Sequence, residues 1–260
     1  MIRPFLIKSF SYKQRRKFWN KIDDLKTIGF GGNLSRLGKI YGTDKVGKHF
    51  YTNHYQSHFK AFKYKGINFL EIGVGGYDKP TVGGRSLRMW KRYFPFGKIY
   101  PLDIHEKSFL NESRIKIFQG SQVDEAFLNE VVSETGDLDI IIDDGSHVNE
   151  HVIKTFELLF PKLKKGGIYA VEDMQTSYWP DFGGDSENLN NPSTMMNYFK
   201  ALTDSLNNRE FIKPGYVQNI YDKEIVSIHF YHNLMFIHKG DNNEESNLVI
   251  ENYRKLRSEL

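Results

Sequence analysis

From residue 67 onwards, short apolar runs alternate with stretches whose apolar residues recur at helical spacing. Short apolar runs bounded by glycines and polar residues indicate strands that are buried on both faces of a parallel sheet. The stretches between them indicate the helices that connect parallel strands. The predicted strands cover residues 67–73, 98–103, 114–119, 137–143 and 167–171, and the predicted helices between them cover 85–93, 124–134 and 148–160.

Two further apolar runs, 225–231 and 234–238, follow a predicted helix over 194–207 and are separated by His232-Asn233. Two strands joined by so short a turn predict an antiparallel hairpin. We therefore expect an α/β fold. It is a doubly wound, Rossmann-like, mostly parallel seven-stranded sheet whose edge is closed by a C-terminal antiparallel β-hairpin.

The first 60 residues have a different pattern and predict a small helical N-terminal segment ahead of a sheet domain over 61–260. Helical spacing extends over 11–26 and 34–41, on either side of a glycine-rich break. The segment that follows, 48–55, is dense in His, Tyr and Lys. Its aromatic residues fit either a helix packed on the core or a lid over a ligand site, and both interpretations can hold.

Composition narrows the class of protein. The chain has 260 residues, of which 39% are hydrophobic, enough for the core of one large domain. The net charge of +4 is too small for a dedicated nucleic-acid binder, and the absence of cysteine excludes disulfides and thiolate metal sites. No apolar run approaches the roughly 20 residues of a membrane span, and the first residues do not form a secretory signal. We therefore expect a cytoplasmic protein that binds neither nucleic acid nor membrane.

Acidic residues follow two of the predicted strands at the point where each strand ends. Asp143-Asp144 ends one apolar run and Glu172-Asp173 ends the next, and His147 follows closely. Ligands bind at the carboxyl ends of parallel strands, and three carboxylates share a cleft only when a positive charge lies among them. If the strands are neighbours, Asp144, Glu172 and Asp173 predict a divalent metal site. The alternatives are helix capping by the acidic pair and a backbone-bonded His147.

A glycine-rich acidic turn follows the first predicted strand. Gly73 and Gly75 would let the backbone pass close to a ligand, and Glu71 could accept a hydrogen bond from an ammonium group or a ribose hydroxyl. Ser86, at the start of the next helix, could cap that helix or contact the ligand. The glycine spacing differs from the G-x-G-x-x-G dinucleotide pattern, so the turn alone is weak evidence of a ligand.

Polar residues also follow the second and third predicted strands. Asp103 ends the second strand, where a carboxylate in a doubly wound fold commonly accepts bonds from the two ribose hydroxyls of a nucleoside. The alternative role for Asp103 is a helix N-cap. Ser121 and Gln122 follow the third strand and would lie at the purine end of the same ligand.

Six motifs between residues 40 and 184 carry a resemblance to a known family. They are Tyr-Gly-Thr-Asp-Lys, Leu-Glu-Ile-Gly-Val-Gly-Gly, Ser-Leu-Arg-Met-Trp, Leu-Asp-Ile, Asp-Asp-Gly-Ser-His and Glu-Asp-Met-Gln-Thr-Ser-Tyr-Trp. Together with the strand order and the closing hairpin, they resemble the metal-dependent sugar O-methyltransferases of macrolide tailoring, the mycinamicin type, among the class I S-adenosylmethionine-dependent enzymes.

This resemblance implies a site and a reaction. Residues 61–260 would form the methyltransferase domain, His147 would be the general base, and Asp144, Glu172 and Asp173 would bind Mg²⁺, with Mn²⁺ as a possible substitute. The reaction would transfer a methyl group from S-adenosylmethionine to a hydroxyl of a sugar. By the same resemblance and the strand-end pattern, the cofactor would lie along Glu71, Gly73, Gly75, Ser86, Asp103, Ser121, Gln122 and Asp143.

Aromatic and hydrogen-bonding side chains are expected against the sugar ring of a glycosylated natural product or of a nucleotide- or polysaccharide-linked sugar. The candidates are Tyr51, His54, Tyr55, Tyr178 and Trp179. The family resemblance also suggests a homo-oligomer.

Other functions stay open on the sequence alone. A cephalosporin hydroxylase-like metal enzyme shares the fold and motifs, and its product would gain one oxygen where a methyltransferase product gains one methyl group. A catechol-type O-methyltransferase is a further alternative. A non-catalytic nucleoside-binding subunit is disfavoured by the acid and histidine set, because such a module needs no general base. An RNA methyltransferase is disfavoured by the modest net charge.

Overall fold

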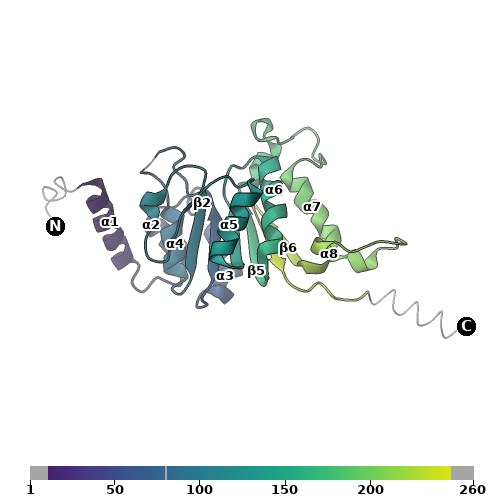
Figure 1. Cartoon of the computed structure of the whole chain (residues 1–260), viewed down its shortest axis with the longest axis horizontal. Coiled ribbons are helices and arrows are strands. Elements are labelled where there is room, and N and C mark those ends of the chain that lie inside the picture. The colour runs from purple at the N-terminus through teal and green to yellow at the C-terminus, as the bar shows by residue number, and fades with distance from the viewer. Residues whose placement is uncertain (1–10, 80, 247–260) are drawn as a thin grey trace, which may run out of the picture.

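A computed structural model describes residues 11–79 and 81–246 of the chain and contains one seven-stranded sheet (Figure 1). The strand order across the sheet is β3-β2-β1-β4-β5-β7-β6. The strands are β1 (Asn68–Ile72), β2 (Lys98–Asp103), β3 (Phe118–Gln119), β4 (Leu138–Asp143), β5 (Leu163–Glu172), β6 (Ile225–Tyr231) and β7 (Leu234–Lys239).

The strand directions confirm the expected doubly wound sheet with its closing hairpin. The strands β1 to β5 pair in parallel, and β7 then pairs antiparallel with both β5 and β6. The order reverses between β1 and β4, which is the switch point where open α/β sheets bind ligands. The carboxyl ends of β1, β4 and β5 are therefore adjacent.

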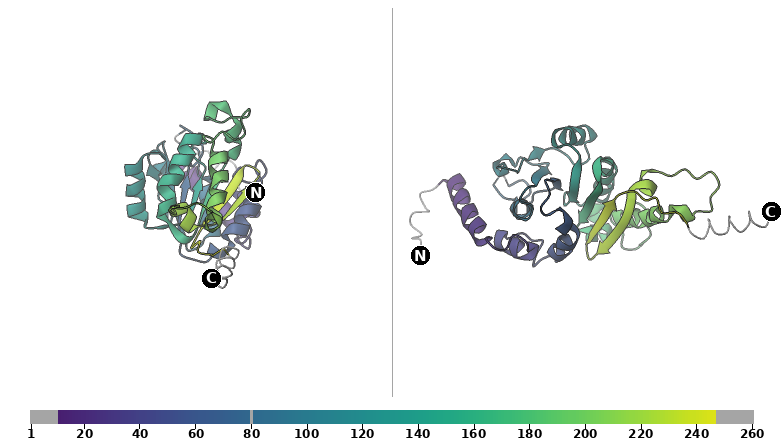
Figure 2. Two further views of the ribbon diagram at one scale, coloured as in Figure 1. Left: turned by 90° about the vertical axis from the view of Figure 1, so that its right-hand side faces the viewer. Right: turned by 90° about the horizontal axis from the view of Figure 1, so that it is seen from below.

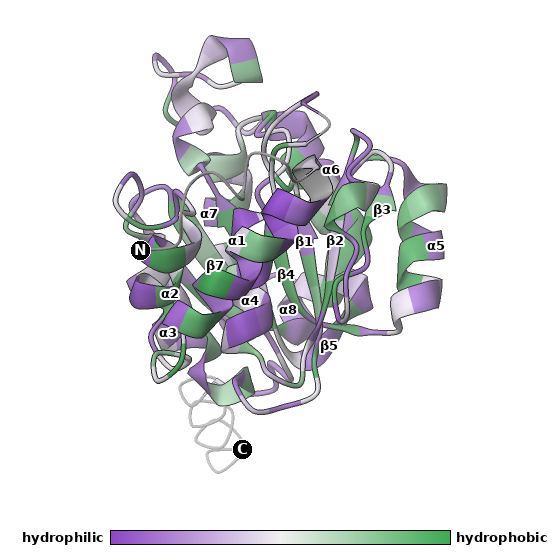
Figure 3. Cartoon of the chain, turned by 90° about the vertical axis from the view of Figure 1, so that its left-hand side faces the viewer, coloured by the Kyte–Doolittle hydropathy of each residue, from purple (hydrophilic) through white to green (hydrophobic). Residues whose placement is uncertain are grey.

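Helices cover both faces of this sheet, which explains the continuous apolar runs of its strands. Ile140 and Ile142 of β4 pack in the core under α2, α3 and α4, whereas Ile141 packs in the core under α5, α6 and α7. In Figure 3 the central strands are hydrophobic, while most helices carry both hydrophilic and hydrophobic residues. The helices are α1 (Tyr12–Lys26), α2 (Leu34–Tyr41), α3 (Tyr51–Phe59), α4 (Arg85–Tyr93), α5 (Glu125–Thr135), α6 (Asn149–Leu159), α7 (Met195–Leu206) and α8 (Ile220–Glu224).

The N-terminal helices follow one another along one side of the molecule, as the right-hand view of Figure 2 shows. The helices α2 and α3 precede residue 61 but share a core with β1 and α4. The ring centroids of Tyr55 and Phe59 lie 5.1 and 5.9 Å from that of Trp90. The aromatic segment therefore includes a helix packed on the core, as one interpretation predicted, and its role as a lid stays a prediction.

Two predicted strand boundaries were wrong. The strand expected over 114–119 is reduced to Phe118–Gln119, with isolated bridges from Ile115 to Ile99 and to Glu112. Arg114 has a φ of +64°, and its guanidinium donates to the carbonyl oxygens of Phe94 and Gly97, so the backbone turns where a strand would run straight. The strand expected at 167 begins at Leu163.

The sequence also missed two kinds of short helix. The helix α8 was not predicted, and the long polar loop after β5 contains the 3-10 helices η4 (Met174–Tyr178) and η5 (Pro180–Phe182). Such short elements lack the repeated apolar spacing that identifies longer helices. Among the described residues, no helix combines the length and the apolar character that a membrane span requires.

Candidate active site

The acidic residues at the ends of β4 and β5 come together, as the sequence predicted. In the parallel register Asp143 lies opposite Val171, so the residues that follow both strands meet at one edge of the sheet. Nε2 of His147 lies 4.0 Å from Oδ1 of Asp144 and 3.8 Å from Oδ2 of Asp173. Asp144, His147 and Asp173 each offer one ligand atom, and these atoms lie within 4.8 Å of one another.

Two of these residues have an unusual backbone conformation. His147 has a φ of +58° and Asp173 a φ of +54°, both in the left-handed region that non-glycine residues seldom adopt. The surrounding structure holds them there, because Oγ1 of Thr176 donates to the carbonyl oxygen of His147 at 2.8 Å. Strain of this kind costs about 1–3 kcal/mol per residue and is concentrated at functional sites.

A buried lysine that sequence reasoning missed lies among the carboxylates. Nζ of Lys45 lies 2.6 Å from Oδ2 of Asp144, 2.6 Å from Oε1 of Glu172 and 3.6 Å from Oε1 of Glu71, and its side chain is only 2% exposed. Lys45 ends the Tyr-Gly-Thr-Asp-Lys motif, which contributed to the family resemblance but suggested no role. The signal that could have found it is the cluster itself, because buried carboxylates require a basic partner.

Two tyrosines of α3 also bind the acidic residues directly. The hydroxyl of Tyr55 donates to Oε1 of Glu172 at 2.6 Å, and the hydroxyl of Tyr51 donates to Oδ1 of Asp173 at 2.8 Å. Both rings are buried. These residues, expected as sugar contacts, are therefore placed as partners of the carboxylates, where they orient Glu172 and Asp173.

Burial and mutual repulsion shape the protonation of the cluster. The pKa of Glu172 is raised well above its ordinary value, first by burial and then by Asp144, although Lys45 and Tyr55 oppose the shift. Burial raises the pKa of Glu71 to about 7. Burial alone lowers the pKa of Lys45, yet the pKa is well above its ordinary value because Asp144, Glu172 and Glu71 favour the ammonium form.

The charges leave room for a cation at this site. Glu71, Asp144 and Glu172 face one ammonium group, that of Lys45. Asp173 accepts from the hydroxyl of Tyr51 and lies near the imidazoles of His49 and His147. Oε1 of Glu71 is a buried carboxylate oxygen without a hydrogen-bond partner among the described residues. The donors are mainly carboxylate oxygens, the ligands that hard divalent ions prefer. The residues present therefore fit a divalent metal ion beside Lys45.

A cavity of about 550 Å³ lies next to this cluster, between the glycine-rich turn after β1 and the loop that carries Lys45. Gly73, Gly75 and Ser86 line it, together with Asp144. Its volume is within the range typical of small-molecule sites, about 300–1,000 Å³. Of the eight predicted cofactor residues, these three are the ones that reach the cavity wall.

The acids at the ends of β1 and β4 lie behind the cavity wall. Glu71 is fully buried, and its Oε2 accepts a hydrogen bond from the hydroxyl of Ser86 at 3.0 Å. Asp143 is buried as well and bonds to Gln122 and to the amide of Gly145, and burial raises its pKa to about 7. Glu71 and Asp143 therefore support the loops after β1 and β4 through hydrogen bonds and do not face the cavity.

The remaining predicted cofactor residues tie neighbouring loops together. Asp103 accepts the amide protons of Val74 and His105, at 3.1 and 2.9 Å, so it joins the turns after β1 and β2. Oε1 of Gln122 accepts the amide proton of Ser146 at 2.8 Å, which ties the loop after β3 to the loop after β4. Ser121 lies half-buried in that same loop, and its hydroxyl accepts from the amide of Val123.

Three further predicted substrate residues lie in different places. Tyr178 and Trp179 follow β5 and are 38% and 49% exposed, so they are available to a ligand. His54 stacks on Tyr231 at a centroid distance of 3.8 Å, on the hairpin side of α3. The structure therefore separates His54 from the acidic cluster that Tyr51 and Tyr55 contact.

Gly73 holds the turns after β1 and β4 in close contact. It has a φ of +82°, and a Cβ at this position would overlap the carbonyl group of Asp144. We expect Gly73→Ala to lower the free energy of unfolding by more than about 2 kcal/mol, because the left-handed conformation alone costs an alanine roughly 1–2 kcal/mol. Urea unfolding measures the change.

Gly75→Ala is the matched control for this prediction. Gly75 has a similar φ of +70° but no atom within 4 Å of its Cβ position, so its replacement should cost only the conformational penalty. Equal losses of stability in the two variants would show that the contact with Asp144 is unimportant.

No protein-family model matches the chain. Individual proteins do match. The mycinamicin VI 2''-O-methyltransferase of Micromonospora griseorubida is 45% identical over 218 residues, which are 82% of this chain and 54% of that protein. The demethylmacrocin O-methyltransferase of Streptomyces fradiae has the same identity and coverage. A tetracenomycin-C relative of Streptomyces olivaceus, the 8-demethyl-8-alpha-L-rhamnosyl tetracenomycin-C 2'-O-methyltransferase, is 43% identical over 80% of this chain and 55% of its own length.

A solved structure agrees with these relatives. The MycE methyltransferase from the mycinamycin biosynthetic pathway, in complex with Mg and SAH, superposes with a TM-score of 0.80 at 45% identity, over 82% of this chain and 56% of that one. The present chain spans about half the length of the curated relatives it matches. The matched regions cover 80–82% of this chain. The chain is therefore a homologue of part of these mycinamicin and tetracenomycin sugar O-methyltransferases, and it shares the fold of the matched part of MycE.

Proposed function

We propose that this protein transfers a methyl group from S-adenosylmethionine to a hydroxyl of a sugar, in a reaction that requires a divalent metal ion. The observation that carries the proposal is the convergence of Asp144, Asp173 and His147 beside a glycine-lined cavity. The relatives support it, because they are named as O-methyltransferases and the MycE structure holds Mg and SAH. SAH is S-adenosylmethionine after loss of its methyl group.

The metal would be held by Asp144 and Asp173, with Glu172 completing the set. Oxygen ligands favour Mg²⁺, and Mn²⁺ is the next candidate. When bound, such an ion lowers the pKa of an acceptor hydroxyl and orients it. Lys45 would balance the remaining negative charge, since its ammonium group contacts both Asp144 and Glu172.

The cofactor would occupy the cavity beside Gly73 and Gly75, where the lack of a Cβ atom lets a ligand approach the backbone closely. S-adenosylmethionine supplies an already activated methyl group. The carboxylate of Asp103 does not line this cavity and joins the turns after β1 and β2, so it would accept the ribose hydroxyls only of a cofactor that extends past the cavity to the end of β2, where doubly wound folds commonly place this acid. Glu71 does not line the cavity and would affect the cofactor indirectly, by orienting the hydroxyl of Ser86.

His147 would remove the proton of the acceptor hydroxyl at Nε2. This nitrogen lies 4.0 and 3.8 Å from carboxylate oxygens of Asp144 and Asp173, the two residues that would hold the metal. The left-handed backbone conformation of His147, held by the hydrogen bond from Thr176, restricts the direction in which the ring points. General bases of this kind contribute about 10²- to 10⁴-fold to a rate.

The acceptor is proposed to be a sugar of a glycosylated natural product or a nucleotide- or polysaccharide-linked sugar. Tyr178 and Trp179 offer exposed aromatic surface near the end of β5, which suits a sugar ring. We propose residues 61–260 as the methyltransferase domain and residues 1–60 as the helical segment that supports the site through Lys45, Tyr51 and Tyr55. A cytoplasmic location and a homo-oligomer stay predictions.

Cofactor binding tests the proposal first. We expect S-adenosylhomocysteine to bind the purified protein with micromolar affinity in calorimetric titration, and Asp103→Ala to abolish that binding because the ribose loses its acceptor. Asp103→Asn keeps an acceptor for the amide of Val74 and shows whether the loop or the charge matters. Glu106→Ala is the control, because this carboxylate lies near Asp103 in the chain but is exposed and accepts the amide proton of Ser108 instead of joining the turns after β1 and β2.

Reaction products test the chemistry. With Mg²⁺ and a suitable glycoside, the product mass should increase by one methyl group, and chelation of the metal should stop the increase. A gain of one oxygen would overturn the proposal, and so would the failure of S-adenosylhomocysteine to bind with or without Mg²⁺.

A further inference from the structure

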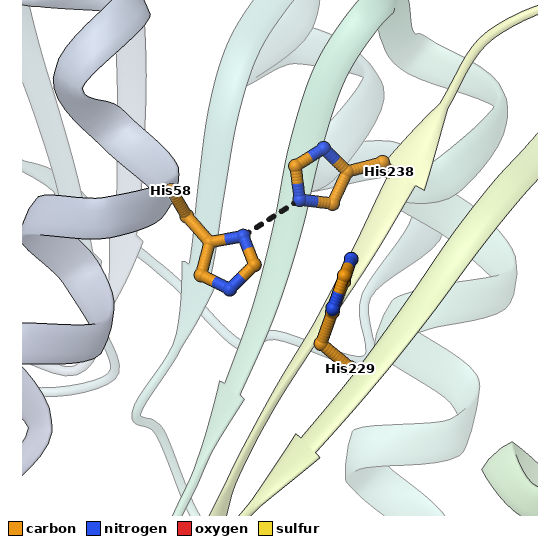
Figure 4. A group of neighbouring side chains, drawn as sticks. All are labelled: His58, His229 and His238. Atoms are coloured by element: carbon orange, nitrogen blue, oxygen red, sulfur yellow. Dashed lines mark hydrogen bonds between the residues drawn. The ribbon is translucent and has the colours of Figure 1, made fainter.

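Three histidines meet on the hairpin side of α3, away from the acidic residues described above. His58 comes from α3, His229 from β6 and His238 from β7, and Figure 4 shows their rings turned toward one another. The hairpin register pairs Ser227 with His238 and His229 with Phe236, so His229 and His238 are diagonal neighbours on one face. We call these three residues the histidine cluster.

The rings of the histidine cluster are close enough to share one ion. One ring nitrogen from each residue lies within 4.8 Å of the corresponding atoms of the other two. Nδ1 of His58 is already 2.8 Å from Nε2 of His238. Two nitrogens on a tetrahedral zinc ion, each about 2.0–2.1 Å from the metal, lie about 3.3 Å apart. The pair therefore needs to open by only about half an ångström.

The surroundings prepare His58 for coordination. Its Nε2 bonds to the hydroxyl of Tyr231 at 3.0 Å, and its ring stacks on Phe236 at 4.0 Å. Metal-binding histidines are usually oriented in this way, with one nitrogen bonded to a protein group and the other directed at the ion. The second nitrogen of His58 is the one that points at His238.

Two of the three rings, those of His58 and His238, are buried enough to favour the neutral form that a metal requires. Burial lowers the pKa of both His58 and His238 to about 4, helped by the neighbouring imidazoles, so both rings are neutral near pH 7. Neutral imidazole binds transition metals, whereas a protonated ring does not. No acid takes part in this group, in contrast to the site at the ends of β4 and β5.

We propose that the histidine cluster is a second metal site, which binds one Zn²⁺ ion through His58, His229 and His238. An all-imidazole set suits Zn²⁺ and other transition metals and does not suit Mg²⁺, which prefers oxygen ligands. The side chains are half-buried, so water has access to the fourth coordination position. The proposal is independent of the methyltransferase function and would stand if that function failed.

The position of the cluster gives such an ion a structural effect. His58 lies on the same helix as Tyr51 and Tyr55, whose hydroxyls bind Asp173 and Glu172. An ion shared between His58 and the hairpin would tie α3 to β6 and β7. It would thereby hold the two tyrosines against the carboxylates of the active site.

The experiment measures Zn²⁺ binding to the 260-residue chain, which carries no histidine tag and has been stripped of metal with a chelator. Competition with a chromophoric zinc chelator should give one site of micromolar affinity or tighter in the Asp144→Asn variant, in which the acidic site is impaired. His229→Ala and His238→Ala, each made in that background, should weaken binding by at least about 100-fold, because loss of a ligand exceeds the 10- to 100-fold cost of losing a supporting bond.

Matched controls separate the histidine cluster from other donors. His105→Ala, which removes an exposed histidine far from the cluster, should leave Zn²⁺ affinity unchanged. Co²⁺ should give a visible absorption spectrum typical of nitrogen coordination in Asp144→Asn and lose it when His238 is replaced by Gln. The circular dichroism spectrum of each variant should match that of the parent. This control distinguishes the removal of a metal-binding side chain from unfolding of the protein.

Three results would overturn the proposal. The first is affinity unchanged by the His229 and His238 substitutions, which would place Zn²⁺ elsewhere. The second is the loss of all binding in Asp144→Asn, which would place it at the acidic site. The third is the absence of binding in the folded parent protein, which would show that the histidines are only a hydrogen-bonded packing cluster.

Discussion

His147→Ala is expected to lower the rate of methyl transfer by roughly 10²- to 10⁴-fold, the contribution of a positioned general base. Nε2 of His147 faces Asp144 and Asp173, and His147 is not among the residues that line the cofactor cavity. S-adenosylhomocysteine should therefore bind the His147→Ala variant with nearly unchanged affinity. Steady-state rates and calorimetric titration measure the two effects separately.

The backbone of His147 calls for a second variant. Its φ of +58° is costly for alanine, so His147→Ala could disturb the loop as well as remove the base. Asn tolerates the left-handed conformation and lacks a suitable base, so His147→Asn should lose the same activity with less loss of stability. His151→Ala is the control, because His151 lies one turn further on and bonds to Ser146. Normal turnover in His147→Asn would contradict the assignment.

Lys45→Met is expected to destabilise the protein by roughly 3–5 kcal/mol, the cost of removing one partner from a buried ion pair. Nζ of Lys45 lies 2.6 Å from both Asp144 and Glu172, and its side chain is only 2% exposed, so solvent compensates little for the lost charge. The methionine side chain has a similar length and fills most of the space. Urea unfolding in the absence of metal measures the effect.

The ion-pair explanation makes two further demands on Lys45→Met. Adding Glu172→Gln should recover part of the lost stability, because it removes one of the carboxylates left unpaired. Mg²⁺ should raise the unfolding temperature more in Lys45→Met than in the parent, because a divalent ion then supplies the missing charge. Lys48→Met, an exposed neighbour, should change little. Equal effects at both lysines would refute the explanation.

Local patterns in the sequence were sufficient for most of the fold. The apolar run at Ile140–Ile142 identified a strand buried on both faces, and the acids that follow it identified the edge of the sheet that carries the site. Such patterns are informative because buried side chains recur at short, regular spacing along each helix and strand. The shortened β3 was not predictable in this way, because Arg114 leaves the strand conformation to bind carbonyls about 20 residues away.

The partners of the functional residues were decided by tertiary structure alone. Lys45 binds Asp144 and Glu172 across 99 and 127 residues of sequence, and His58 meets His238 across 180. Periodicity reports whether a side chain is buried, but it carries no information on which distant polar group lies opposite. The sequence by itself therefore determined the fold class, the acidic cluster and His147. Only the packing of α3 and the Lys45 loop onto the sheet decided how that cluster is neutralised and held, because those contacts form after the chain has folded back on itself.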